Sequence, residues 1–274
     1  MTDNRARRAG DHRALGARAL DARSSFTEYL SAHAPEAMPL RDSRVATSSV
    51  QHLTAEATTI VALQYADGVV MAGDRRATAG TMIASRDIEK VFPADEYTAI
   101  GISGAAGIGM ELARLYSVEL EHYEKIEGVR LSLDGKANRL ASMLRGNLPL
   151  AMQGLVAVPI LAGWDARRET GRIFSFDATG GRYEEHEHHG IGSGSLFARG
   201  ALKKLWKAGQ PGDQAVHTAV EALFDAADDD SATGGPDPIR RLWPVVATVT
   251  AEGYARVSDD VIAGIVSDIA KARG

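Results

Sequence analysis

The chain of 274 residues contains no cysteine, which excludes disulfide bonds, thiol nucleophiles and cysteine-ligated metals. No stretch of 18 residues is continuously apolar, so no membrane-spanning helix is expected. An excess of basic residues is also missing: the net charge is −5, and nothing suggests nucleic-acid binding. The N-terminus carries arginines but lacks the apolar segment of a secretory signal, so a cytoplasmic location is the default.

The sequence has the ordinary composition of a globular protein, with 45% hydrophobic and 24% charged residues. Its length suits one large domain or two small ones. Residues 1–57 differ from the rest, since they carry eight arginines, no lysine and few apolar residues. This composition predicts a flexible segment with a short helix near 24–34, and its interspersed acids argue against an organelle transit peptide.

Two apolar runs, 57–65 and 69–73, are separated by Asp67 and Gly68 and predict a β-hairpin, because Gly68 can take the positive φ of a tight turn. If Thr58 at the start of this hairpin became a chain terminus, one residue would carry a hydroxyl and a free α-amine. An α-amine has a pKa of about 8, so part of it is neutral near pH 7 and can act as a base.

Two nearby residues could complete such a site. Asp74 ends the second strand of the hairpin, and Lys90 precedes the apolar pair Val91 and Phe92. A buried ammonium lowers the cost of forming a threonine alkoxide, and a carboxylate would keep that ammonium charged and in place. On these residues alone a structural role has the greater weight, because threonines before strands and charged strand ends are common.

The rest of the pattern gives a sequence of strands and helices. It predicts a loop at 78–81, a strand at 97–103, helices at 106–125 and 133–145, a strand at 156–164, a hairpin of 172–177 and 182–187, helices at 195–207 and 214–227, a strand pair at 245–250 and 254–257, and a closing helix capped by Ser258. Hairpin-joined strands favour antiparallel sheets, each covered by a helical pair. The pattern alone therefore indicates an α+β fold.

Several runs then identify a family. TTIVALQYADGVVMAGDRRATAG, IEKVF and YTAIGISGAAG are followed by ELARLYSVELEHYEK, RGNLPLAMQG, GSGSLFA and DAADDDSATGG. Together, in this order and spacing, they resemble the β-type subunits of the proteasome core particle, above all the actinobacterial kind, from Thr58 to about Val257. The resemblance implies the N-terminal nucleophile hydrolase fold, a four-layer αββα sandwich with two antiparallel sheets. It also implies that residues 1–57 are a propeptide removed autocatalytically and that 58–274 are the catalytic domain.

The resemblance further implies a threonine endopeptidase and assigns its residues. Cleavage between Ala57 and Thr58 would make Thr58 the N-terminal nucleophile, with Asp74 and Lys90 as its partners. Gly104 would supply the oxyanion-hole N–H, and the remaining hydrogen-bond network would comprise Ser193, Asp230 and Thr233. The implied substrate pocket is lined by Ala77, Thr78, Ile88, Ile102, Ala106 and Met110, none of them charged. Many relatives have glycine in place of Ala57 and serine in place of Thr233.

The resemblance also implies partners and the absence of cofactors or metals. The expected assembly has homo-heptameric β rings stacked between outer rings of α-type subunits in a four-ring cylinder, with an ATPase ring that feeds it unfolded proteins. Two alternatives stay open: a non-catalytic ring subunit, and a self-processing amidohydrolase with a small-molecule substrate. The joint presence of Thr58, Asp74 and Lys90 favours the protease.

Three other motifs are weaker candidates for a site. His186, Glu187, His188 and His189 could begin a metal site, with His186 and His188 on one strand face, but no further ligand is clearly placed. The acidic run 228–230 is better explained as a helix end. The run 192–195 resembles a phosphate loop but lacks the P-loop lysine and spacing, so a nucleotide site is not expected.

Overall fold

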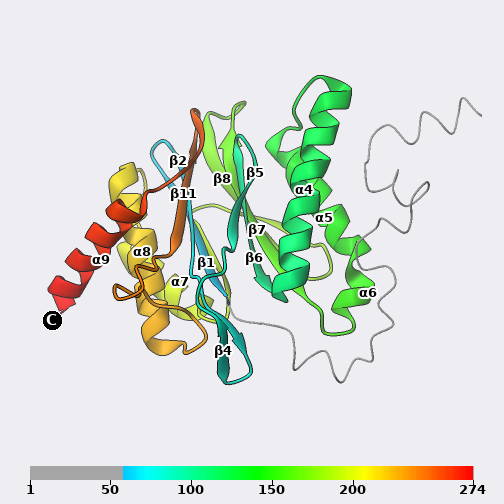
Figure 1. Cartoon of the computed structure of the whole chain (residues 1–274). Helices are drawn as coiled ribbons and strands as arrows, with labels where there is room; N and C mark the ends of the chain where they lie inside the picture. Colours follow the sequence, from blue (N-terminus) through cyan, green and yellow to red (C-terminus); the bar gives the residue numbers. More distant parts are fainter. Residues whose placement is uncertain (1–57, 274) are drawn as a thin grey trace, which may run out of the picture. The chain divides into compact units, whose positions relative to one another are not determined.

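The structure is a computed structural model that describes residues 58–273 (Figure 1). The predicted propeptide, with its helix near 24–34, lies outside the described residues. The strands are β1 (Thr59–Tyr65), β2 (Gly68–Gly73), β3 (Ala77–Ala79), β4 (Met82–Ser85), β5 (Val91–Asp95), β6 (Thr98–Gly104), β7 (Ala157–Asp165), β8 (Thr170–Phe176), β9 (Arg182–Glu185), β10 (His188–Gly192), β11 (Val245–Thr250) and β12 (Gly253–Arg256). The helices are α4 (Ala106–Glu127), α5 (Leu133–Gly146), α6 (Leu148–Ala151), α7 (Ser195–Leu205), α8 (Gly212–Asp229) and α9 (Asp259–Arg273).

The described chain divides into two units. Residues 58–117 and 132–273 belong to the larger one, and residues 118–131 belong to the smaller one. Within the smaller unit the second half of α4 carries an ion pair between Lys125 and Glu121, 2.5 Å apart and one turn from each other. Gly128, with φ +68°, ends the helix in the left-handed conformation that glycine adopts most easily.

The first large sheet has the strand order β10-β1-β2-β11-β12, and every neighbouring pair is antiparallel. The predicted hairpin is confirmed as β1 and β2, with Tyr65 opposite Gly68. Gly68 is needed for a reason that the sequence did not show: a Cβ placed there would lie 2.1 Å from the carbonyl oxygen of Val249 on β11. The glycine therefore allows β11 to approach β2 closely.

The second large sheet has the order β5-β6-β7-β8-β9 and is also antiparallel. A third, two-stranded sheet pairs β3 with β4. The prediction of a loop at 78–81 is therefore wrong at its first two residues, which belong to β3, and right at the turn that follows. Gly80, with φ +58°, lies in that turn. The hairpin projects with Met82 71% exposed, so it lacks the alternating burial that marks a strand in sequence.

The larger unit is built in four layers (Figure 1). Side chains that include Ile60, Met71 and Ile160 fill the space between the two five-stranded sheets. The opposite face of the first sheet packs on α7, α8 and α9. On the outer face of the second sheet lie α5 and the part of α4 up to Ser117, joined by a 2.8 Å hydrogen bond from Tyr116 Oη to the Lys136 carbonyl oxygen. The predicted αββα arrangement of antiparallel sheets is confirmed.

A buried arginine ties α5 to the second sheet. Arg172 on β8 is 2% exposed, and its guanidinium bonds carboxylates of three elements: Asp134, Asp165 and Glu184, each at 2.7 Å. The hydrogen bond from Arg172 lowers the pKa of Asp134 to about 2, against the opposing effect of burial. A single fully paired cation therefore holds three acidic groups at the edge of the core.

The histidine cluster does not form the arrangement considered from sequence. His186 and Glu187 lie in a bend, and β10 begins only at His188, so the expectation that His186 and His188 share a strand face is wrong. Among residues 58–273 no group of three or more potential ligands could hold a metal ion.

Candidate active site

Thr58 lies immediately before β1 and is 5% exposed. Its carbonyl oxygen accepts a 3.0 Å hydrogen bond from the Ser193 N–H. Gly192, the residue before Ser193, has φ +95°, and a Cβ there would lie 1.7 Å from the Thr58 carbonyl oxygen. The turn that follows β10 thus holds the peptide group after Thr58 at a distance that only glycine permits.

Asp74 and Lys90 are in direct contact beside Thr59. The Asp74 carboxylate accepts four hydrogen bonds: Oδ1 from Thr59 N at 2.8 Å and Lys90 Nζ at 2.6 Å, and Oδ2 from Arg76 N at 2.9 Å and Gly234 N at 2.8 Å. Lys90 Nζ also donates to the Arg76 carbonyl oxygen at 2.5 Å. Burial lowers the pKa of Lys90, an effect that outweighs the opposing influence of Asp74. The pair is a buried, hydrogen-bonded cation and anion next to β1.

A cavity of about 20 Å³ joins Thr58 to Lys90 and Gly104. Five of the six predicted pocket residues line it, namely Ala77, Ile88, Ile102, Ala106 and Met110. Thr78 is not among the lining residues, since it lies on β3 opposite Ile83. Sequence reasoning did not foresee the other lining residues, which are Glu89, Phe92, Ser103, Ala105 and Gly109. The cavity is mainly apolar and has Met110, about half exposed, among its walls.

Gly104 ends β6 just before α4 begins. Its φ is +101°, and a Cβ there would lie 2.2 Å from the carbonyl oxygen of Val156. The next residue, Ala105, donates its N–H to that oxygen at 2.8 Å. The first turn of α4, through Ala106 and Gly109, forms one wall of the cavity. A helix N-terminus carries partial positive charge, so this wall favours a negative charge that develops nearby.

The three remaining predicted site residues form one hydrogen-bonded group behind Thr58. Asp230 Oδ2 accepts from Ser193 Oγ and from Thr233 Oγ1, both at 2.6 Å. Burial raises the pKa of Asp230, but these two hydrogen bonds, the Ala232 N–H and the charge of Arg76 together outweigh it, so the pKa is lowered overall. Asp230 follows the last residue of α8, as the helix end predicted at 228–230 requires. Thr59 joins this group, since its Oγ1 lies 2.6 Å from Thr233 Oγ1.

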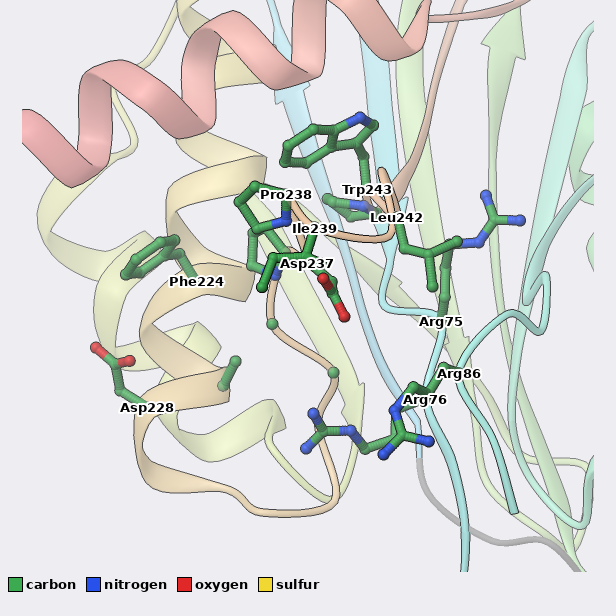
Figure 2. Close-up of a pocket in the computed structure, with 15 residues that line it drawn as sticks. Arg75, Arg76, Arg86, Phe224, Asp228, Asp237, Pro238, Ile239, Leu242 and Trp243 are labelled. Atoms are coloured by element: carbon green, nitrogen blue, oxygen red, sulfur yellow. The ribbon is translucent and has the colours of Figure 1, made fainter. Parts of the chain in front are cut away.

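A second cavity, of about 360 Å³, has Arg76 and Gly234 among its lining residues (Figure 2). Its walls include Phe224, Pro238 and Trp243. None of the predicted site residues lines it. Charged groups at its edge already have partners: Arg76 donates to the Ser231 carbonyl oxygen at 2.8 Å, and Asp237 is paired with Arg240 at 2.7 Å. Although it is larger, this cavity lacks a nucleophile with a neighbouring base, so the cavity at Thr58 is the candidate active site.

Sequence reasoning missed several groups that complete the site. They are Thr59, the main-chain N–H groups of Arg76, Gly194 and Gly234, and the side chain of Phe92. Only Thr59 had a signal in the sequence, because it adjoins Thr58 and also carries a hydroxyl. The others depend on contacts between residues up to 160 positions apart.

Comparison with known proteins adds an independent observation. The family model described as proteasome subunit matches residues 54–239, a range that includes every candidate site residue. A protein named proteasome subunit beta, from Acidothermus cellulolyticus, is 57% identical over 254 residues, which cover 91% of this chain and 87% of that relative.

Proposed function

This chain belongs to the proteasome subunit family, where it is similar to a β-type subunit, and from that membership we propose that it is a catalytic subunit. It acts as a threonine endopeptidase whose nucleophile is Thr58. The observation that carries the proposal is the meeting of Thr58, Lys90 and Gly104 at one mainly apolar cavity, with Asp74 bonded to the lysine at 2.6 Å. A nucleophile, a buried cation and an oxyanion donor are the parts that acyl transfer requires.

The proposed reaction uses the chain's own groups. Thr58 Oγ attacks the substrate carbonyl carbon, and its proton passes to the free α-amine, directly or through water. The Gly104 N–H stabilises the tetrahedral oxyanion, supported by the N-terminus of α4. The amine leaves with a proton, an ester forms on Thr58, and water hydrolyses it. Lys90 stays charged through its bond to Asp74 and lowers the cost of the alkoxide.

Maturation follows from the same chemistry. The precursor cleaves itself between Ala57 and Thr58, which releases residues 1–57 and exposes the α-amine that the reaction needs. Intact mass and N-terminal sequencing of the assembled particle test this step, and the expected first residue is Thr58. Thr58→Ala should keep residues 1–57 attached. A wild-type particle whose chain begins at another residue contradicts the proposal.

The proposed substrates are unfolded proteins cut after apolar residues, within a cylinder of two heptameric β rings between outer rings of α-type subunits. An ATPase ring supplies the substrates, and the particle works in the cytoplasm. No helix within residues 58–273 is both long and apolar enough to cross a membrane. Expressed alone, the chain should be poorly processed and nearly inactive. Co-expression with the α-type subunit should give a large particle that cleaves fluorogenic peptides. Size-exclusion chromatography with an activity trace measures both the particle size and the cleavage.

The same experiment separates the alternatives. A large particle that retains residues 1–57 and cleaves no peptide would indicate a non-catalytic ring subunit. A fully active monomer would contradict the proposal that the chain works inside a closed cylinder of rings, and it would favour a self-processing amidohydrolase.

A further inference from the structure

Thr59, the residue after the proposed nucleophile, contacts both halves of the site. Its main-chain N–H donates to Asp74 Oδ1 at 2.8 Å, and its carbonyl oxygen accepts from Asp74 N at 3.1 Å. Its side chain is fully buried and points into the other half, where Oγ1 lies 2.6 Å from Thr233 Oγ1 and accepts from Gly194 N at 2.9 Å. One residue thus bonds the Asp74–Lys90 pair through its backbone and the Ser193–Asp230–Thr233 group through its hydroxyl.

The number of protons fixes the direction of these hydrogen bonds. The Thr233 hydroxyl has a single proton and donates it to Asp230 Oδ2 at 2.6 Å. The proton between Thr59 and Thr233 must therefore come from Thr59, whose oxygen in turn accepts the Gly194 N–H. The series runs in one direction, from Gly194 through Thr59 and Thr233 to Asp230. Hydrogen bonds arranged in series polarise one another, so each hydroxyl strengthens the next bond.

The packing leaves no substitute for the Thr59 hydroxyl. A Cβ placed on Gly194 would lie 2.4 Å from Thr233 Oγ1 and 2.6 Å from Thr59 Oγ1, so not even a methyl group fits between them. Without the hydroxyl, the Gly194 N–H has no acceptor in this contact, and the Thr233 oxygen loses the donor that holds its proton toward Asp230. An unsatisfied buried donor is costly, and the turn at 192–194 that holds the Thr58 carbonyl would shift to relieve it.

We propose that the Thr59 hydroxyl is a positioning group that holds the peptide of Thr58 in register with the Ser193–Asp230–Thr233 group, so that self-cleavage and peptide hydrolysis both depend on it. The inference rests on the proposed function and adds a residue that does not touch substrate. Because it acts on geometry near the reacting atoms, its loss lowers kcat and leaves KM nearly unchanged.

The test compares Thr59→Val, which keeps the shape and removes the hydroxyl, with Thr59→Ser, which keeps the hydroxyl. Each variant is assembled with the α-type subunit, processed sites are counted by intact mass, and kcat and KM are measured with a fluorogenic peptide. We expect Thr59→Val to lose about tenfold or more in kcat per processed site and in the rate of self-cleavage, with KM within about twofold. Thr59→Ser should stay within about threefold of wild type in kcat.

Thr98→Val is the matched control, because Thr98 is also fully buried in a strand and its hydroxyl accepts from Lys136 Nζ at 2.9 Å on the outer side of the second sheet. It should keep wild-type kcat per processed site. A second check combines Thr59→Val with Thr233→Val: members of one hydrogen-bonded series should give a double variant about as slow as the slower single one. If the loss in the double variant were instead the product of the two single losses, the two hydroxyls would act independently and the proposed hydrogen-bonded series would be overturned.

If Thr59→Val keeps the wild-type kcat per processed site and shows only a lower melting temperature, Thr59 has a purely structural role and the inference is overturned. If Thr59→Val does not assemble, Thr59→Cys, with its weaker donor, replaces it under the same criteria. The proposed function can be refuted separately. Peptide cleavage that survives in Thr58→Ala refutes the threonine mechanism and, with it, this inference. Full activity of Thr59→Val beside an inactive Thr58→Ala refutes the inference alone.

Discussion

Replacing Lys90 with methionine removes one charge from the candidate site and keeps most of the side-chain volume. The fold should survive, because the Asp74 carboxylate retains three main-chain donors, from Thr59, Arg76 and Gly234, at 2.8 to 2.9 Å. Lys90→Met therefore tests the role of the ammonium without emptying the site, which makes it sharper than Lys90→Ala.

The cost in stability follows from burial. Lys90 and Asp74 are 5% and 1% exposed, and breaking a buried ion pair costs about 3–5 kcal/mol. The three remaining N–H groups compensate part of the charge on Asp74, so we expect a net loss of about 2–3 kcal/mol in the free energy of unfolding. This leaves a folded subunit that can still be assembled and purified.

The cost in activity should be larger. Lys90 and the proposed nucleophile Thr58 line the same small cavity. The loss of one preorganised electrostatic group typically lowers turnover by ~100-fold or more, which is about 2.7 kcal/mol in the activation barrier. Cleavage of a fluorogenic peptide by assembled particles measures this, with processed sites counted by intact mass. Self-cleavage should slow in parallel, because it uses the same nucleophile.

Lys136→Met provides the matched control. Lys136 is a second buried lysine, paired with Asp95 at 2.6 Å on the outer side of the second sheet. It should lose comparable stability and keep normal turnover per processed site. Near-normal turnover in Lys90→Met particles would refute the assigned role of Lys90, and an equal loss in both variants would show that destabilisation alone explains it.

Three further outcomes are expected. Peptides that end in Tyr or Leu should be cut faster than peptides that end in Asp, since the predicted pocket residues carry no charge to pair with a carboxylate; the reverse order would show that the pocket is misassigned. Gly192→Ala should block self-cleavage, seen as a retained propeptide in intact mass, because its Cβ would lie 1.7 Å from the Thr58 carbonyl oxygen, whereas Gly200→Ala has nothing within 4 Å of the new Cβ and should mature normally. Burial lowers the pKa of Lys90 below its ordinary 10.5, so turnover should fall at a pH under 10.5 as the ammonium loses its proton. Asp74 raises the pKa of Lys90, so Asp74→Asn should move the alkaline limb of the pH–kcat profile to lower pH.

The elements that the sequence predicted well are those with a local signal. The β1–β2 hairpin follows from Asp67 and Gly68 between apolar runs, and every described helix except the four-residue α6 follows from its 3.6-residue period. The β3–β4 hairpin escaped prediction because it projects with exposed side chains, and β5 because Pro93 interrupts its short run. In each case the strand is defined by its partner and not by its own pattern.

The site divides in the same way. Chemistry and resemblance together predicted Thr58, Asp74 and Lys90 as site residues, and residue spacing gave no distance between them. The Gly234 N–H reaches Asp74 across 160 positions, which no local pattern reveals. Arg172 shows the same limit in the core: an arginine in a strand suggests an exposed face, but three carboxylates from distant segments allow it to be buried.

The hydrogen bonds around the peptide group after Thr58 have a consequence for the proposed activation by self-cleavage. The Ser193 N–H bonds the carbonyl of Thr58 itself, and the Asp74 contact uses the N–H of Thr59, so neither bond involves an atom of Ala57. Both bonds are available in the precursor and in the product. These two contacts therefore need not change during the proposed activation, which breaks one covalent bond. Its cleavage converts an amide nitrogen, which does not take up a proton near pH 7, into an amine that can.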